Sequence, residues 1–131
     1  MGDKHILGDL QHAIMRVLWA EGEATVARVQ EALEGDRDRA LTTIATMLVK
    51  MEKKGIVDHR SEGRQFVYRA LISETEVQRS MVGELTEMLF GGDVTALVSH
   101  LLTEQEIDDA EIARLKALIA EHRSKERRRG R

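Results

Sequence analysis

Residues 41–54 place short hydroxyl side chains and lysines at the spacing of one helix face. Leu41, Ile44, Leu48 and Met51 recur at intervals of three and four residues, which predicts an amphipathic helix. A threonine hydroxyl can hydrogen-bond a base or a phosphate, and lysines hold phosphates without reading sequence. This segment is therefore predicted to enter the major groove of DNA. Its polar face carries Thr42, Thr43, Thr46, Lys50, Lys53 and Lys54.

The segment after this helix is predicted to form a hairpin of two strands, over residues 56–60 and 65–70, around a turn that contains Gly63. Arg60 and Arg64 lie at or near the predicted tip, where they can reach the DNA backbone or the minor groove. A polar helix followed by a basic hairpin is the layout of a winged helix-turn-helix. Taken singly, each residue also fits ordinary solvated surface, so the prediction of DNA binding depends on their combination.

The charge distribution supports this interpretation, although the net charge of -3 by itself argues against non-specific binding to nucleic acid. Residues 39–69 carry seven basic and three acidic side chains, whereas residues 73–122 carry three basic and eleven acidic ones. Residues 123–131 carry six basic side chains and one acidic side chain. A local basic patch is what contact with phosphates requires.

Several classes of protein lack support in the sequence. The chain has no cysteine, which excludes disulfides and thiolate metal sites and is compatible with a reducing cytoplasm. Its five histidines are far apart and form no HExxH pattern, so no metal or other cofactor is expected. No nucleophile elbow, phosphate-binding loop or dinucleotide-binding motif is present, and no catalytic residue is predicted. No apolar run approaches the ~18 residues of a membrane span, so we expect a cytoplasmic location.

The chain is predicted to be mainly α with a small β-hairpin, in two domains and a tail. A winged helix DNA-binding domain is expected over residues 1–72, a helical dimerisation domain over 73–122 and a disordered basic tail over 123–131. Asp9, Thr25 and Asp93 are candidate helix N-caps. Two segments, Ser73–Glu76 and Thr103–Glu106, fit the capping box that opens a helix.

The helices of residues 73–122 hold many aliphatic side chains but only one aromatic, Phe90, and have no evident third layer to pack against. A second copy of the chain would supply that layer, so we expect a homodimer. The residues predicted to form the dimer are Val77, Met81, Leu85, Leu89, Val94, Leu97, Val98, Leu101, Leu102, Ile107, Leu115 and Leu118.

Three segments give the chain a family resemblance. They are LGDLQHAIMRVLWAEGEATVARVQEAL, LTTIATMLVKMEKKGIVDHRSEGRQFVYRAL and FGGDVTALVSHLLTEQEIDDAEIARLKALI. They resemble the penicillinase repressors of the BlaI/MecI type, which have the copper-responsive CopY proteins as relatives. The resemblance implies a homodimeric repressor that binds an inverted repeat containing TACA/TGTA. It also implies that Thr42, Thr43, Ala45 and Thr46 face the groove, that Lys50 contacts phosphate and that Arg60 and Arg64 belong to the wing.

The chain departs from this family in features that bear on induction. Some relatives carry Lys or Arg at the positions of Thr42 and Ala45, which implies a different half-site preference. Several of these repressors are cleaved at an Asn-Phe bond, and the matching position here is His100-Leu101. The resemblance therefore does not imply that a β-lactam-sensing membrane protease cleaves this chain. The cysteine cluster of the copper-responsive branch is absent.

The predicted function is that of a sequence-specific, homodimeric transcriptional repressor on an inverted-repeat DNA operator, with resistance genes as candidate targets. One alternative is a winged-helix regulator gated by a small molecule, closer to the multiple-antibiotic-resistance type. Another is a winged-helix protein-interaction module that does not bind DNA.

Overall fold

The computed structural model describes residues 5–34 and 40–130, which fall into two compact units, Met1–Leu85 and Thr86–Arg131. The division lies inside a helix, α4 (Glu74–Phe90), whereas the predicted domain boundary lies before residue 73. The N-terminal unit contains α1 (Asp9–Glu21), β1 (Ala24–Thr25), α2 (Val26–Ala32), α3 (Leu41–Lys53), β2 (Val57–Glu62), β3 (Gln65–Ala70) and the first part of α4.

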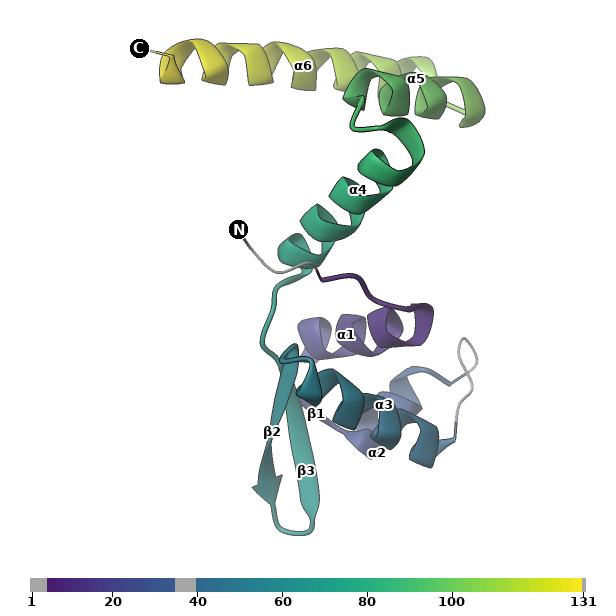
Figure 1. The fold of residues 1–131 in the computed structure, drawn as a ribbon, viewed down its shortest axis with the longest axis vertical. Helices are drawn as coiled ribbons and strands as arrows, with labels where there is room; N and C mark the ends of the chain where they lie inside the picture. Colours follow the sequence, from purple (N-terminus) through teal and green to yellow (C-terminus); the bar gives the residue numbers. More distant parts are fainter. Residues whose placement is uncertain (1–4, 35–39, 131) are drawn as a thin grey trace. The chain divides into compact units, whose positions relative to one another are not determined.

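The sheet of the N-terminal unit is antiparallel and small, with the strand order β1-β3-β2 (Figure 1). The hairpin of β2 and β3 was predicted, and its register pairs His59 with Tyr68 and Arg60 with Val67. The two-residue β1 was not predicted, because a pair of residues is too short to show alternation. It pairs Ala24 with Tyr68 and so attaches the hairpin to the end of α1.

The core of this unit lies between the three helices and the base of the hairpin. Ile14, Leu18, Ile44, Leu48 and Met51 are at most 1% exposed, so the predicted apolar faces of α1 and α3 point at each other. Such burial contributes roughly 1.5–3 kcal/mol for each large aliphatic side chain. At the edge of the core the indole N–H of Trp19 donates to the carbonyl oxygen of Ile72 at 2.9 Å, which ties α1 to the segment after the hairpin.

The start of α4 also belongs to this core, which corrects part of the predicted dimer surface. Val77 is 1% exposed and Met81 packs against the buried cluster. Both were predicted to form the dimer, but in the structure the N-terminal unit covers Val77 and partly buries Met81. Their helical spacing alone could not distinguish between packing within the chain and packing on a second copy.

The C-terminal unit consists of the end of α4, α5 (Val94–Glu104) and α6 (Asp109–Arg129). Asp93 caps α5 as predicted, accepting a hydrogen bond from the backbone N–H of Ala96 at 3.0 Å. The predicted capping box at Thr103–Glu106 is wrong. The Thr103 hydroxyl donates to the carbonyl of Ser99 within α5, and Asp108 caps α6 instead.

The predicted disorder of the basic tail also differs from the structure, where α6 runs as one helix to Arg129 (Figure 1). Its last turns contain the ion pairs Glu121–Lys125 and Glu126–Arg129, at helical spacings of four and three residues. Cations in the last turn also complement the negative end of the helix dipole. Within the described residues, no helix has both the length and the apolar character needed to cross a membrane.

Candidate nucleic-acid interface

The outer face of α3 is the surface predicted to meet DNA. Because Ile44, Leu48 and Met51 point into the core, the opposite side of the helix faces outwards. The exposed residues on that side include Thr42, Thr43, Thr46, Lys50 and Lys53, while Ala45 is half-buried beside them. This face therefore presents small side chains near its first turns and ammonium groups near its last turn.

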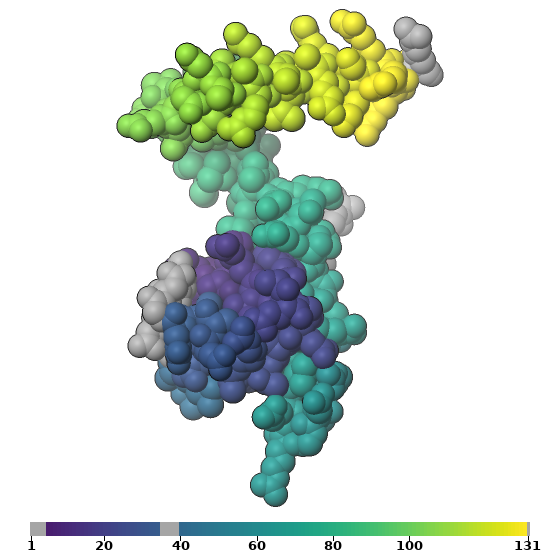
Figure 2. Space-filling model, turned by 180° about the vertical axis from the view of Figure 1, so that it is seen from behind, coloured from purple at the N-terminus to yellow at the C-terminus, as the bar shows by residue number. Residues whose placement is uncertain are grey.

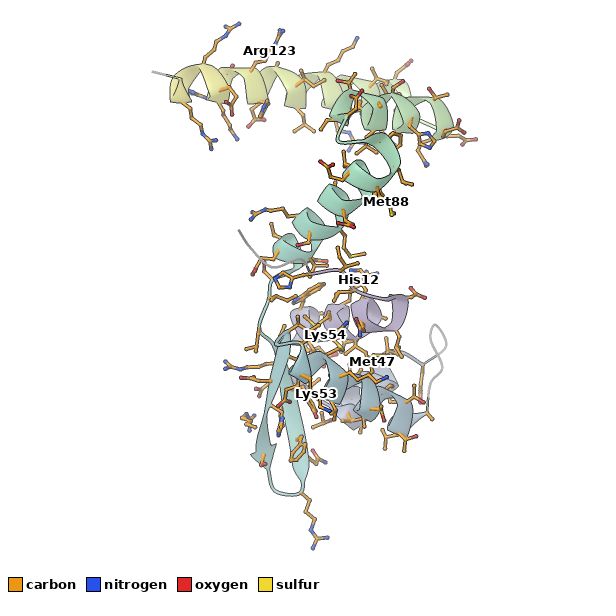
Figure 3. The ribbon with its side chains drawn as sticks, viewed as in Figure 1. His12, Met47, Lys53, Lys54, Met88 and Arg123 are labelled. Carbon is orange, nitrogen blue, oxygen red and sulfur yellow. The ribbon has the colours of Figure 1, made fainter. Side chains whose placement is uncertain are left out.

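Lys54 lies on a different edge of α3 from Lys50 and Lys53. Its ammonium donates to the side-chain oxygen of Gln11 on α1 at 3.5 Å, and the same glutamine amide contacts the sulfur of Met47 at 3.4 Å. Figure 3 shows Met47, Lys53 and Lys54 on and just after α3. Lys54 thus borders the candidate interface on the side of α1.

A glycine turn determines how the hairpin follows α3. Gly55 has a φ of 81°, in the left-handed region that favours glycine, and the N–H of Ile56 donates to the carbonyl of Met51 at 3.2 Å. This is the six-to-one bond of a Schellman motif, which ends the helix and turns the chain directly into β2. The tip of the hairpin projects beyond the helices of the N-terminal unit (Figure 2).

The two arginines predicted for the wing differ in their surroundings. Arg64 is exposed in the turn, and the ion pairs within the described residues do not include it. Arg60 pairs with Glu23 at 2.7 Å and also with Glu62, and these hydrogen bonds raise the pKa of its guanidinium. Two carboxylates therefore already pair with the guanidinium of Arg60. The wing has less unpaired positive charge than a count of its basic residues suggests.

A cluster between α3 and the hairpin was missed by the sequence analysis. Nδ1 of His59 lies 2.6 Å from a carboxylate oxygen of Glu52, near the end of α3. The imidazole stacks on the ring of Phe66, with centroids 4.2 Å apart, and lies 5.3 Å from the ring of Tyr68. These contacts join the end of α3 to the hairpin. The predicted strands placed His59 on the hairpin, but not its distance from α3.

The C-terminal unit exposes an extensive apolar surface. None of the described side chains of α5 or α6 is buried, and Val94, Leu118 and Ile119 are at least 60% exposed. Val98, Leu101, Leu102, Leu115 and Leu118 also line a shallow hollow of about 650 Å³. An apolar surface of this kind on a folded unit indicates an interaction site. Across residues 5–34 and 40–130, no three His, Asp or Glu side chains gather as metal ligands would.

The arrangement of α1, β1, α2, α3 and the β2–β3 hairpin defines a winged helix domain. The chain belongs to the penicillinase repressor family, whose sequence profile matches residues 7–121. The penicillinase repressor of Bacillus licheniformis is 26% identical over 121 residues, which cover 92% of this chain and 94% of that protein. The transcriptional regulator BlaI of Mycobacterium tuberculosis is 34% identical over 110 residues, covering 82% and 80%.

A solved structure supports the winged helix assignment. The solution structure of the DNA-binding domain of the repressor BlaI matches with a TM-score of 0.50 and 32% identity, and covers 58% of this chain and 93% of that domain. The methicillin resistance regulatory protein MecI of Staphylococcus aureus is a more distant relative, 21% identical over 106 residues. The named relatives are repressors and regulators of transcription, not enzymes.

Proposed function

We propose that this protein is a homodimeric repressor that silences transcription by occupying an inverted-repeat operator. The observation that carries the proposal is the outer face of α3, where three exposed threonines precede two exposed lysines on one side of a helix anchored by the core. Short side chains let the helix backbone approach base edges, while the lysines hold the flanking phosphates. Arg64 at the hairpin tip adds a contact to the neighbouring backbone.

Dimerisation is the second part of the proposal. The exposed aliphatic residues of α5 and α6 are suited to a self-complementary interface with a second copy, which would bury them in an isologous contact. The proposed surface keeps the predicted residues of α5, of α6 and of the segment between them, together with two from the end of α4. They are Val94, Leu97, Val98, Leu101, Leu102, Ile107, Leu115, Leu118, Leu85 and Leu89. Two linked subunits would bind two half-sites with a gain in effective concentration, so release of the dimer would derepress the operator.

The decisive experiment is fluorescence anisotropy of the full chain at about physiological salt. It compares a TACA/TGTA inverted-repeat duplex, as the family resemblance implies, with a scrambled duplex of equal length. We expect a preference of roughly 10³-fold or more for the inverted repeat. Equally weak and strongly salt-dependent binding to both duplexes would contradict this operator. Binding to neither would favour the protein-interaction alternative.

A further inference from the structure

A hollow of about 320 Å³ lies between the end of α3 and the inner face of the hairpin. It is lined by Val49, Glu52, Lys53, His59, Phe66 and Tyr68. Two large apolar side chains of its rim face outwards, since Val49 is 47% exposed and Phe66 is 49% exposed. Exposed apolar side chains on the face that carries Thr46 and Lys53 are not explained by the packing of the domain.

Val49 is part of the outer face of α3. It follows Thr46 by three residues and precedes Lys53 by four, so the three side chains form one stripe along the helix. Phe66 belongs to the hairpin face that also carries His59 and Tyr68, as the pairing of Ser61 with Phe66 and of His59 with Tyr68 requires. The hollow therefore connects the proposed groove-reading face with the wing.

We propose that this hollow seats one deoxyribose-phosphate segment of the operator backbone, an inference that rests on the proposed function. When a helix occupies the major groove and a hairpin lies against the adjacent backbone, the strand between them must pass the junction of the two elements. Val49 and Phe66 cover the apolar edge of the sugar. Lys53 and His59 hold the phosphate, Lys53 through its ammonium and His59 through Nε2.

The imidazole has the hydrogen-bonding geometry for this role. Its Nδ1 is taken by Glu52, its ring is fixed on Phe66, and the side chain is 28% exposed. Among the described residues, Nε2 has no hydrogen-bond partner. A protonated imidazole donates from both ring nitrogens, so the ring can bond the Glu52 carboxylate through Nδ1 and a phosphate oxygen through Nε2.

The charged groups around His59 lie on α3 and on both strands of the hairpin. On α3, Glu52 is engaged by the ring and Lys53 adds a positive charge to the same hollow. On β3, burial raises the pKa of the Tyr68 hydroxyl, which favours its neutral form. On the reverse face of the hairpin, Asp58 pairs with Arg69 and also interacts electrostatically with His59, while Arg60 pairs with Glu23 and Glu62.

The first test substitutes the apolar rim. Val49→Ala is expected to weaken binding about threefold to tenfold on both the inverted-repeat and the scrambled duplex, because a sugar contact carries no sequence information. Leu71→Ala is the matched control, since Leu71 is an aliphatic residue of the same unit with 46% exposure and lies outside the hollow. Unchanged affinity of the Val49 variant would overturn the proposal.

The second test removes the ring that presents Nε2 to the phosphate. His59→Gln retains a side chain that can bond Glu52 but has no ring stacked on Phe66. Its affinity is expected to fall about threefold to tenfold on both duplexes, because a phosphate contact carries no sequence information. Thermal melting confirms that the variant folds. A folded variant with wild-type affinity for both duplexes would remove His59 from the site.

These outcomes separate the inference from the proposed function. If the wild type prefers the inverted repeat and the variants behave like the wild type, only the backbone seat is contradicted. If the wild type binds neither duplex, the proposed function fails first.

Discussion

At the scale of single residues, the threonines and the lysines of the α3 face are expected to contribute differently to DNA binding. Thr46 is exposed where the helix would lie deepest in the groove. Thr46→Ala should weaken binding to the inverted repeat by roughly 1–3 kcal/mol and leave binding to scrambled DNA almost unchanged, because the loss falls on a base contact. Anisotropy titrations on both duplexes measure the two effects, and an equal loss on both would exclude base reading by Thr46.

Lys50 should show the opposite behaviour, because it is a point charge beside the threonines. Lys50→Ala is expected to weaken binding to both duplexes and to reduce the slope of log K against log salt by about one. Titrations at a series of salt concentrations give this slope. Lys116→Ala, in the C-terminal unit, is the control for loss of a lysine outside the proposed interface. An unchanged slope for Lys50→Ala would remove that residue from the phosphate contacts.

At the scale of elements, local signals in the sequence predicted some helix starts and not others. Asp9 was predicted to cap the first helix, but it lies inside α1, which begins after Gly8. Thr25 accepts from the N–H of Arg28, and Ser73 and Glu76 form the predicted capping box with two bonds of 3.0 Å. Thr103–Glu106 has the same capping-box pattern, but α5 runs to Glu104 and α6 is capped by Asp108 instead. Propensity alone did not distinguish these two positions.

The capping box of α4 gives a prediction about stability. Ser73→Ala should cost about 1 kcal/mol, since it leaves the N–H of Glu76 without its acceptor.

The backbone hydrogen bond from Ser73 lowers the pKa of Glu76 below 4.5 in the folded protein. Because the pKa of Glu76 is lower in the folded protein than in the unfolded chain, its carboxylate stabilises the fold at pH values above the unfolded pKa. This stabilisation is lost as the pH falls through the folded pKa. Melting curves should therefore show Glu76→Gln destabilised at pH 7, with the difference shrinking below about pH 4.5. A difference that is the same at all pH values would contradict this.

The candidate site shows the same division between local and non-local information. Helical spacing was sufficient to predict which side of α3 faces outwards, because the apolar stripe defines the opposite side. The pairing of Arg60 with Glu23 joins residues 37 positions apart, and the contact of His59 with Glu52 depends on the turn at Gly55. Neither follows from periodicity, since both require the register of the hairpin and its position against the helices.

At the scale of the whole molecule, the exposed apolar residues of α5 and α6 link oligomeric state to DNA affinity. Leu118 is 60% exposed, so Leu118→Asp should cost the isolated chain little but should introduce a charge into the proposed dimer interface. Analytical ultracentrifugation is expected to show a monomer. Affinity for the inverted repeat should fall by about 10²–10⁴-fold, because the second half-site no longer gains from the effective concentration of a linked subunit.

Ala117→Asp is the matched control for that change. Ala117 is exposed on the same helix and lies on a different side from the interface residues Leu115 and Leu118. Ala117→Asp therefore adds the same charge outside the proposed interface. It should remain dimeric and bind the inverted repeat like the wild type. Binding to a duplex with a single half-site should be the same for all three proteins, since that contact uses one winged helix domain. A Leu118→Asp protein that stays dimeric would move the interface away from α6, and a monomer with undiminished operator affinity would break the proposed link between dimerisation and repression.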